Sequence, residues 1–484
     1  MKYLLFGTLA LLSVGLAVAQ SDDDIFHGVS YNDDVTRKFN LDAAGVVEVL
    51  TDVRYRAKSQ EEARAYYYIV PKVNEENLVS LTAVVATSMN EAQVKRVEAS
   101  ATPADIQKTL KAKNSTDEVA IFKISTKKDE SSNGQVTFSI KELYKRRKNP
   151  FPSQIKIKEE QSVNFVDSKY YVSLYPTKTQ KVTFSHNSPN LIFNTPDGGL
   201  VEKKKNLVRY GPYKNVEALS YSEVMLHYKA NQPLPIFTEV KKTIEVSHWG
   251  NINVDEYYEL FNEAAGIKGE FGRVDYQSWD PNRAQYAIKS LETTLPRYIR
   301  GLYYWDYIGN ISTSNANRDD DHVTFRIEPR FPVFGQWKVD WSQGYNMPTR
   351  HHLFQNEAGR FIFNYTFDQD FSDILAENYT LNVILPEGAT NLKVHLPFAV
   401  DSLDKSLYFS TLDFIGRPQL TIKKANVISS LHKESFQVSY EMSANGLLIE
   451  PIFVIAFFFL CFLSAIVYAR VDLSFRDDKK VKTQ

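Results

Sequence analysis

Side chains that could carry out hydrolysis or bind a metal ion in a known arrangement are sparse in this chain of 484 residues. No histidine is followed by glutamate, so the His-Glu-x-x-His metalloprotease pattern is absent, and no Gly-x-Ser-x-Gly turn presents a serine nucleophile. The only cysteine, Cys461, lies inside an apolar segment. The rest of the chain therefore offers neither a thiol nucleophile nor thiolate ligands for zinc.

Imidazole and carboxylate groups offer weaker candidates. His351 and His352 are adjacent, and adjacent side chains of a strand point to opposite faces, so we do not expect one metal ion to bind both. Asp22–Asp24 and Asp319–Asp321 could bind a divalent cation through oxygen, although a solvated amino-terminal segment and a solvated loop are the favoured interpretations. Spacing selects no pair of carboxylates for general acid and base catalysis. We predict no catalytic residue, no cofactor, no cofactor-binding residue and no metal site.

Two apolar segments predict how the chain meets the membrane. Residues 1–19 have a basic start, an apolar run and a final Ala17-Val18-Ala19, which is typical of a secretory signal peptide cleaved after Ala19; an uncleaved anchor is the alternative. The apolar run Pro451–Tyr468 would form a helix of about 27 Å, close to the thickness of the hydrocarbon layer. We predict one transmembrane helix over residues 447–469.

Charge next to this helix predicts its orientation. Residues 470–484 form a short basic tail, and basic residues favour the cytosolic side of a membrane. Residues 20–446 would then be lumenal or extracellular, as in a single-pass type I protein. Lys480 and Lys482 resemble a dilysine signal for retrieval to the endoplasmic reticulum, and a plain basic flank of the helix is the alternative.

The body of the chain has the alternating pattern of half-buried antiparallel strands. Val49, Thr51, Val53 and Tyr55 alternate with charged residues, and Val323, Phe325 and Ile327 repeat the pattern. The predicted class is mainly β with inserted helices, as two β-sandwich-like lumenal domains plus one C-terminal transmembrane helix. The two prolines in Gln232–Pro235 disfavour both a helix and a central strand, so this segment is expected to be an extended connector. The predicted domains are therefore residues 20–235 and 236–446.

Local patterns predict a hairpin and three helices within these domains. Residues 381–385 and 392–396 alternate on either side of Pro386-Glu387-Gly388, which predicts a hairpin. Helices are expected from Asp280-Pro281 through Leu291, from Thr102-Pro103 through Leu110, and from about Val254 to Ala265. A duplication of the two halves is possible but is not visible by eye.

Glycosylation and charge give further expectations. Four Asn-x-Ser/Thr sequons fall in the lumenal part, and a sequon that is used must be exposed. The formal net charge of −1 gives no indication of nucleic-acid binding. The candidate glycosylation sites are Asn114, Asn310, Asn364 and Asn378.

The string Tyr304-Trp305-Asp306-Tyr307-Ile308-Gly309 resembles the Trp-Trp-Asp-Tyr-Gly signature of the catalytic subunit of oligosaccharyltransferase. Isoleucine intrudes before the glycine, and that subunit has many membrane helices. We therefore interpret the string as a strand and turn packed by its aromatic residues.

Several other motifs occur in a fixed order along the chain. They are Arg209-Tyr210-Gly211-Pro212-Tyr213, Val246-Ser247-His248-Trp249-Gly250-Asn251-Ile252, residues 268–277, Leu295-Pro296-Arg297, residues 308–314, residues 328–335, Trp337 and Gly344-Tyr345-Asn346. Together these motifs resemble the ribophorin I family, the large single-pass subunit of oligosaccharyltransferase. The resemblance is sharp over residues 207–350 and weaker elsewhere.

The resemblance implies a non-catalytic subunit in the membrane of the endoplasmic reticulum. Its complex moves an oligosaccharide from dolichyl diphosphate to asparagine of sequons in nascent chains, and catalysis belongs to another subunit. The implied partners are that catalytic subunit, other subunits including small membrane subunits, nascent polypeptides and membrane lipid. Asn310 falls where the family carries a sequon. Animal members have a long cytosolic region associated with ribosome contact, which residues 470–484 do not resemble.

A subunit without chemistry of its own acts through its surfaces, by stabilising the complex and presenting the acceptor polypeptide. Exposed aromatic residues suit this role because they offer contact area at a small entropic cost. Two other functions share parts of the pattern: a single-pass cargo receptor or chaperone, and a glycan-processing enzyme with two carboxylates. The candidate contact residues are Trp249, Trp305, Trp337 and Trp341.

Overall fold

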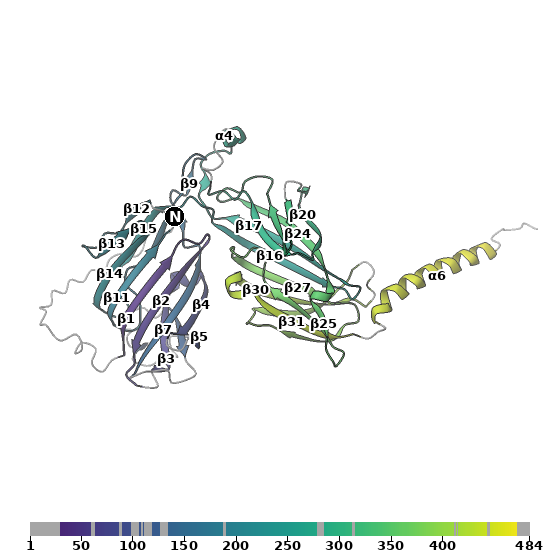
Figure 1. The fold of residues 1–484 in the computed structure, drawn as a ribbon, viewed down its shortest axis with the longest axis horizontal. Helices are drawn as coiled ribbons and strands as arrows, with labels where there is room; N and C mark the ends of the chain where they lie inside the picture. Colours follow the sequence, from purple (N-terminus) through teal and green to yellow (C-terminus); the bar gives the residue numbers. More distant parts are fainter. Residues whose placement is uncertain are drawn as a thin grey trace, which may run out of the picture. The chain divides into compact units, whose positions relative to one another are not determined.

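The computed structural model is mainly β, with one long apolar helix near its C-terminal end, which confirms the predicted fold class (Figure 1). It describes residues 30–59, 63–86, 90–97, 106–107, 110, 119–125, 134–186, 190–277, 285–311, 315–410, 413, 415–442 and 446–471. The helices are α2 (Lys72–Glu75), α4 (Arg273–Gln277), α5 (Ser429–His432) and α6 (Ile449–Arg470), with 3₁₀ turns at Thr349–His351 and Gly446–Leu448.

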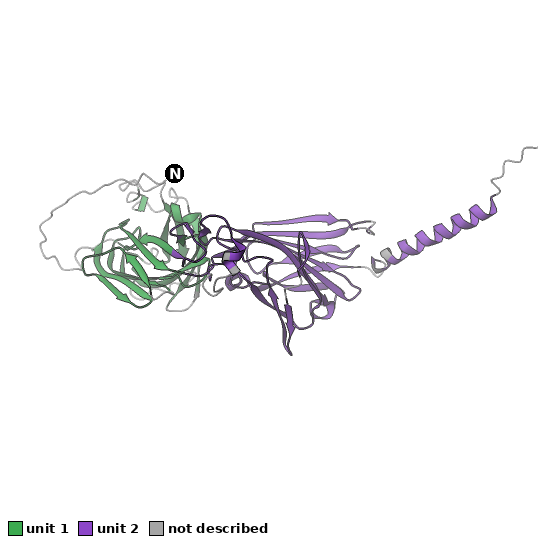
Figure 2. Ribbon diagram, turned by 90° about the horizontal axis from the view of Figure 1, so that it is seen from above, with its two compact units in different colours: residues 1–149, 163–230 green, residues 150–162, 231–484 purple. Residues whose placement is uncertain are grey.

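The chain divides into two compact units (Figure 2). Unit 1 comprises residues 1–149 and 163–230, and unit 2 comprises residues 150–162 and 231–484. Residues 150–162 belong to unit 2 because strand β9 (Gln154–Ile155) pairs with β18 (Gly266–Ile267), and because the side chain of Gln161 accepts a hydrogen bond of 2.7 Å from the Ala265 amide. The predicted boundary after Pro235 places residues 150–162 in the first domain, whereas in the structure they belong to unit 2.

Unit 1 has two sheets, packed on one hydrophobic core. The described strands of the larger sheet follow the order β13-β14-β11-β1-β2-β7-β4-β5-β6-β3, and those of the smaller sheet follow β12-β15-β10-β8. Their bounds are β1 (Tyr31–Asn40), β2 (Val46–Arg56), β3 (Ala65–Pro71), β4 (Leu78–Val85), β5 (Asn90–Val97), β6 (Val119–Ser125), β7 (Gln135–Lys145), β8 (Asn149–Pro150), β10 (Ser162–Ser168), β11 (Thr177–Ser185), β12 (Leu191–Asn194), β13 (Val201–Lys204), β14 (Leu207–Val216) and β15 (Glu223–Lys229).

Unit 2 packs a large sheet and a small sheet on a second core, with a three-stranded sheet beside them. The orders are β21-β20-β24-β17-β16-β27-β30-β29, β25-β26-β31-β28 and β19-β23-β22. The bounds are β16 (Pro235–Val246), β17 (Asn251–Asn262), β19 (Leu291–Pro296), β20 (Arg300–Asp306), β21 (Gly309–Asn310), β22 (Asn315–Arg318), β23 (His322–Ile327), β24 (Lys338–Pro348), β25 (Leu353–Gln355), β26 (Phe361–Phe367), β27 (Ala376–Ile384), β28 (Thr390–His395), β29 (Ser402–Tyr408), β30 (Arg417–Val427) and β31 (Glu434–Glu441).

The two units repeat one strand order. The run β13-β14-β11-β1-β2-β7-β4 of unit 1 corresponds to β29-β30-β27-β16-β17-β24-β20 of unit 2, and the small sheets correspond as β12-β15-β10-β8 and β28-β31-β26-β25. In each unit the central strand, β1 or β16, pairs in parallel with one neighbour and antiparallel with the other. This agreement is a structural repeat of the kind that a duplication of the two halves would produce, and it was not visible in the sequence by eye.

The alternation of apolar and polar residues predicts a strand well where the two faces of that strand differ in polarity. Val49, Thr51, Val53 and Tyr55 of β2 are all buried, and so are Val323, Phe325 and Ile327 of β23. The inward side chains of both strands belong to the cores, as period-two burial requires. Both strand predictions are confirmed.

The predicted hairpin of residues 381–396 is wrong, although both of its strands exist. Strand β27 belongs to the large sheet of unit 2, where it pairs with β16 and β30. Strand β28 belongs to the small sheet and pairs with β31. The turn at Pro386-Glu387-Gly388 therefore carries the chain from one sheet to the other, and both strands alternate because each has one face on the shared core.

The three predicted helices have different outcomes: one is a strand, one is not helical where it is described, and the third is helical at its described positions. Residues 254–262 form part of strand β17, in which Val254, Glu256, Tyr258 and Leu260 point inward. Residues 278–284 lie outside the described residues, and Leu291 begins strand β19. In the third segment, Ile106, Gln107 and Leu110 are helical and the remaining positions lie outside the described residues.

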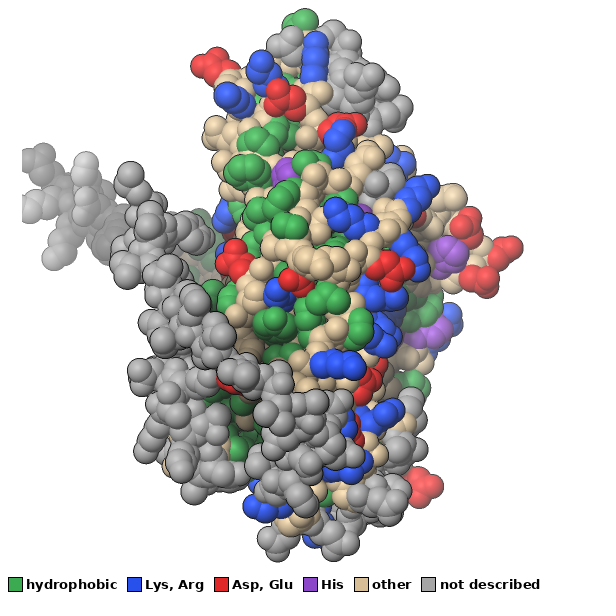
Figure 3. Space-filling model, turned by 90° about the vertical axis from the view of Figure 1, so that its left-hand side faces the viewer, with side chains coloured by type: hydrophobic (Ala, Val, Ile, Leu, Met, Phe, Trp, Pro, Cys, Tyr) green, Lys and Arg blue, Asp and Glu red, His purple; other side chains and the backbone are tan. Residues whose placement is uncertain are grey.

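The face drawn in Figure 3 mixes side chains of every type among the described residues. On this face, hydrophobic side chains lie between basic and acidic ones rather than in one continuous area. The cores must hold this body together without covalent links, because Cys461 in α6 is the only cysteine of the chain. Burial and polar contacts inside the two units therefore determine its stability.

Gly335 marks a place where two backbones of unit 2 touch. A Cβ atom there would collide with the carbonyl oxygens of Ala264 and Ala265, which belong to backbone and cannot rotate away. We expect Gly335→Ala to lower the free energy of unfolding by about 3 kcal/mol or more. Gly359→Ala is the control, since nothing lies near it and only its positive φ of 79° costs about 1 kcal/mol. Thermal unfolding of the full-length chain in detergent measures both, and equal losses would contradict the close packing.

Candidate functional site

A charged side chain occupies an inward position at the centre of unit 2. Val240, Lys242, Ile244 and Val246 share one face of β16, and all four are buried. On the neighbouring strand β17, Glu256 lies directly opposite Lys242 in the register. Alternation therefore carries an amine and a carboxyl group into the core together.

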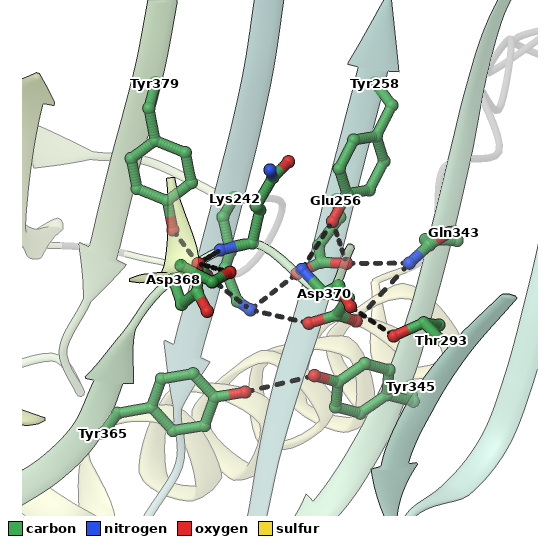
Figure 4. Close-up of polar contacts among 12 residues, drawn as sticks. Lys242, Glu256, Tyr258, Thr293, Gln343, Tyr345, Tyr365, Asp368, Asp370 and Tyr379 are labelled. Carbon is green, nitrogen blue, oxygen red and sulfur yellow. Dashed lines mark hydrogen bonds and ion pairs between the residues drawn. The ribbon is translucent and has the colours of Figure 1, made fainter. Parts of the chain in front are cut away.

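Lys242 is the centre of a buried polar network, shown in Figure 4. Its Nζ atom lies 2.6 Å from Glu256 Oε1 and 3.2 Å from Asp370 Oδ1, and it donates to the Asp368 carbonyl at 3.3 Å. The Lys242 side chain is only 3% exposed and the Glu256 side chain is 0% exposed. The ammonium group thus finds three oxygen partners where water cannot reach it.

Hydroxyl and amide groups complete the network. The Tyr258 hydroxyl and the Gln343 amide each donate to Glu256 Oε2 at 2.9 Å. The Tyr379 hydroxyl donates to the Asp368 carbonyl at 3.0 Å, and the Thr293 hydroxyl donates to the carbonyl of Asp370. The network ties together five strands, β16, β17, β19, β24 and β27, and the loop after β26, which supplies Asp368 and Asp370.

Burial and charge shift the pKa values of this network. Burial and the nearby charge of Asp370 raise the pKa of Glu256, Lys242 opposes both, and the net pKa is about 8. Burial alone would lower the pKa of Lys242, but the negative charges of Asp370 and Glu256 outweigh it and raise that pKa well above its usual value. Lys242 is therefore an ammonium ion at neutral pH, which makes it unsuitable as a nucleophile or a base.

Unit 1 has a counterpart at the corresponding strand. Arg37 is an inward residue of β1 between Val35 and Phe39, and its guanidinium contacts Asp167 at 2.9 Å and Glu142 at 3.6 Å. Arg147 also contacts Asp167, at 2.8 Å. Burial alone would raise the pKa of Asp167, but Arg37 and Arg147 outweigh it and lower that pKa. Each unit thus buries one cation on its central strand and neutralises it with carboxylates.

Sequence reasoning missed both networks, although a signal was present. A cation that falls in the apolar register of an alternating strand, such as Lys242 between Val240 and Ile244, must be buried if the strand pairs as its neighbours require. Such a residue needs an internal partner. The partner Asp167 lies near the end of β10 and the partner Asp370 lies in the loop after β26, and both strands belong to the small sheets, so the approach of these carboxylates depends on the tertiary fold.

The histidines are arranged differently from the expectation, whereas Asp319–Asp321 match the favoured interpretation as a solvated loop. His351 lies in a 3₁₀ turn rather than a strand, and both His351 and His352 contact the ring of Tyr298. The His352 Nε2 atom lies 2.9 Å from the Tyr298 hydroxyl. Asp319–Asp321 form an exposed loop, and Asp22–Asp24 lie outside the described residues. Within the described ranges, no group of three or more His, Cys, Asp or Glu side chains is placed to bind a metal ion.

The four candidate tryptophans fall into different environments. Trp249 is 66% exposed at the turn between β16 and β17, and Trp305 is 46% exposed on β20. Trp337 is partly buried against Phe271, Phe331 and Phe334. Trp341 is only 1% exposed, and its indole nitrogen donates to Gln343 in the core. The prediction of Trp341 as a surface contact is therefore wrong, because its strand turns that side chain inward.

The string that resembles the catalytic signature forms a strand and a turn, as predicted, and the turn is a hairpin tip between β20 and β21. Of its aromatic residues only Tyr304 is packed inside, because Trp305 and Tyr307 are exposed. The Asp306 carboxylate accepts hydrogen bonds from the amides of Ile308 and Gly309, and the Arg330 side chain binds the same carboxylate, at 2.5 Å from Nε. The hydrogen bond from Arg330 lowers the pKa of Asp306. This clamp holds out Tyr307 and Ile308, which are strongly exposed and which the sequence did not single out.

The sequons differ in access. Asn310 is exposed on β21, directly across from Trp305. Asn364 lies on β26 between β25 and β31, and its side-chain oxygen is buried. Asn378 is exposed, and its side chain donates to the Thr238 carbonyl at 3.0 Å. Asn114 lies outside the described residues, as do Lys480, Lys482 and the predicted signal peptide.

The apolar segment forms one continuous helix. Over Pro451–Arg470 its mean hydropathy is 2.7 and none of the segment is buried in the protein. Length and composition suit a membrane span, and a buried core helix is excluded because the side chains have no protein cover. The helix begins at Ile449, close to the predicted start of the span at residue 447.

Comparison with known families identifies the chain's relatives. The model of one family, ribophorin I, matches residues 30–469, which include both units and most of α6. The chain belongs to the ribophorin I family. The resemblance found in the motifs of residues 207–350 therefore extends over nearly the whole described chain.

Curated relatives carry one common name, dolichyl-diphosphooligosaccharide–protein glycosyltransferase subunit 1. The chain is 36% identical over 361 residues to subunit 1 of Caenorhabditis elegans, which covers 75% of this chain and 61% of that protein. It is 33% identical over 469 residues to subunit 1A of Arabidopsis thaliana, covering 96% and 73%. The chain thus spans about three fifths of the length of the nematode relative.

Among solved structures, an M1 zinc metallopeptidase from Deinococcus radiodurans matches 43% of the chain at 10% identity with a TM-score of 0.26. A likeness this weak has no bearing on the fold or activity of this ribophorin I family member.

The raised pKa of Glu256 predicts a specific pH dependence of stability. The folded state holds a proton on Glu256 that the unfolded state releases, so stability falls as pH rises from about 4.5 to about 8. Glu256→Gln should remove this loss, which is on the order of 2–4 kcal/mol. The measurement is thermal unfolding of both proteins across that range.

Glu259→Gln provides the matched control on the same strand. Hydrogen bonds from Lys338 and Thr238 lower the pKa of Glu259, so its titration lies below this pH range. Its unfolding curve should run parallel to that of the wild type between pH about 5 and about 8. If Glu256→Gln also ran parallel, Glu256 would not be the protonated group of the network.

Proposed function

We propose that this chain is an accessory, non-catalytic subunit of oligosaccharyltransferase. The complex would transfer a preassembled oligosaccharide from dolichyl diphosphate to asparagine of Asn-x-Ser/Thr sequons, with the chemistry in another subunit. The observation that carries the proposal is the family match over residues 30–469, together with relatives named as subunit 1 of that glycosyltransferase. The buried, fully neutralised character of the charged networks supports a role through surfaces.

The proposed location is the membrane of the endoplasmic reticulum, with both units in the lumen. Support comes from α6, which is long and apolar enough to cross once, and from the basic residues that follow it in the sequence. In this orientation the sequons lie on the side where glycosylation takes place. Type I topology is therefore part of the proposal.

The proposed partners are the catalytic subunit, other subunits including small membrane subunits, nascent polypeptides and lipid. The hairpin tip at Trp305, Tyr307 and Ile308 suits contact with a protein, because its aromatic side chains are exposed and are held rigidly by Asp306 and Arg330. Rigid aromatic anchors lose little entropy on binding. We propose that such surfaces stabilise the complex and hold acceptor segments near the active subunit.

Membership of the complex predicts the outcome of affinity capture. The tagged full-length chain, solubilised in mild detergent, should recover the multi-spanning catalytic subunit, because an accessory subunit is bound within the assembly. Depletion of the chain should lower sequon occupancy on reporter glycoproteins, measured by mass spectrometry. Recovery without the catalytic subunit, together with normal occupancy, would refute the proposal.

Access predicts which sequon carries a glycan. We expect Asn310→Gln to remove one unit of endoglycosidase-sensitive mass on gel electrophoresis, because Asn310 is exposed and a modified asparagine must be. Asn364→Gln is the matched control and should leave the mobility unchanged, since Asn364 lies on β26 between β25 and β31 and its side chain is only partly exposed. A chain with no glycan at all would contradict the lumenal location of unit 2.

A further inference from the structure

Several exposed apolar side chains of unit 2 belong to segments connected to the start of α6. We call them the membrane-proximal rim: Trp249, Leu407, Tyr408, Phe409, Ile415 and Leu448. Five of the six are more than 45% exposed, and Tyr408 is 37% exposed. Such a collection needs an explanation, since a single exposed apolar residue is ordinary but several together mark a contact surface.

Contacts tie the members of the rim to the start of the helix. A pocket of about 260 Å³ is lined by Trp249, Glu387, Arg417, Met442 and Gly446. Glu387 accepts hydrogen bonds from the amides of Ile415 and Gly416, and the ring of Phe409 lies directly over Gly416. Gly446 begins the 3₁₀ turn that leads through Leu448 into α6.

The helix determines how far the rim can lie from the bilayer. The apolar span begins at Pro451, five positions after Gly446. At a helical rise of 1.5–2 Å per residue, this distance along the helix axis is about 8–10 Å. The headgroup layer on each side of the hydrocarbon is about 5–7 Å thick. The pocket lined by Gly446 and Trp249 therefore lies at the outer edge of the headgroups if α6 spans the membrane.

The turn that carries Trp249 is rigid and aims its two aromatic residues in opposite directions. His248 packs inward, 2.8 Å from the Tyr440 hydroxyl and edge-on to the ring of Phe361. The Trp249 amide donates to Ser247 Oγ, and Gly250 takes a positive φ of 99° that closes the turn. The Trp249 side chain therefore points outward, and two thirds of its surface is exposed to solvent.

Two basic side chains stand beside Trp249. A second pocket, which shares Asn251 with the first, is lined by Gly250, Arg300 and Arg350. Both arginines are exposed, and within the described ranges neither forms an ion pair with a carboxylate. One guanidinium group can donate two parallel hydrogen bonds to the oxygens of a phosphate. Indole rings prefer the boundary between headgroups and acyl chains.

We propose that the membrane-proximal rim rests on the lumenal surface of the bilayer, with Trp249 in the interfacial layer and Arg300 and Arg350 on lipid phosphates. The bilayer is the favoured occupant because the rim is continuous with the membrane helix. The inference goes beyond subunit membership and rests on the proposed function only for the membrane span of α6. Unit 2 would then be held on the membrane at two places, the helix and the rim.

Quenching of tryptophan fluorescence by lipid tests the proposal. The full-length chain is reconstituted into phosphatidylcholine vesicles whose acyl chains are brominated close to the headgroup. Trp249→Phe should lose most of the lipid-dependent quenching. Trp305→Phe is the matched control and should keep it, because Trp305 lies five residues along β20 from Arg300, which is about 16 Å farther from the rim.

A second variant tests the phosphate contacts with Trp249 in place. In vesicles that also contain phosphatidylserine, Arg300→Gln combined with Arg350→Gln should reduce the quenching and make it insensitive to salt. Unchanged quenching in this variant would overturn the assignment of the two arginines to phosphates. Equal quenching of wild type and Trp249→Phe would overturn the rim as a lipid contact and leave a protein partner as its cover.

Membrane insertion is measured on the same vesicles, so that the two failures can be told apart. Resistance of the chain to alkaline carbonate extraction reports the span of α6 alone. Extraction of the chain would refute the membrane span of the proposed function, and the rim with it. Resistance together with no effect of Trp249→Phe would refute the rim only.

Discussion

Each unit is organised around a cation buried on its central strand. An ammonium or guanidinium group removed from water costs several kcal/mol unless it is paired, and loss of one partner from such a pair costs about 3–5 kcal/mol. Lys242 finds its buried oxygen partners only if β17 brings Glu256 to its register and the loop after β26 brings the Asp370 carboxylate over it. A shifted strand or a displaced loop would leave the charge without a partner, so the network selects one arrangement of both sheets.

The repeated strand order makes the differences between the two networks informative. Arg37 and Lys242 occupy corresponding strands. The Asp167 carboxylate comes from the end of β10, and the Asp370 carboxylate comes from the loop after β26, the corresponding strand of the other small sheet. The remaining carboxylate differs: Thr51 faces Arg37 in the register, whereas Glu256 faces Lys242. Unit 1 takes its glutamate from β7 instead, where Glu142 approaches the broader guanidinium. The requirement for neutralisation has thus been kept while the residue that meets it has moved.

The sequence predicts the strands whose two faces differ in polarity and fails where a charge lies on the inward face. In β2 the burial of Val49 and Val53 follows directly from alternation. In β17 the inward Glu256 and the outward Tyr257 hide the same period, which is why a helix was expected there. Exposure of a tryptophan depends on which way its strand turns, so Trp305 and Trp341 have opposite environments. Long-range pairing, such as β27 with β16 rather than with β28, is set by the repeated topology and has no local signal.

The rigid interior also determines where the outer contact surfaces lie. Strand β20 begins at Arg300, beside the membrane-proximal rim, and ends at Asp306, which clamps the hairpin tip with Tyr307. Its length between these ends is about 20 Å, and its pairing with β24 prevents it from bending independently. If the rim rests on the bilayer, the aromatic tip is held at a fixed height above it. A subunit that presents polypeptide to a membrane-embedded enzyme needs such a fixed distance, because an acceptor asparagine must reach a site whose own height is set by the membrane.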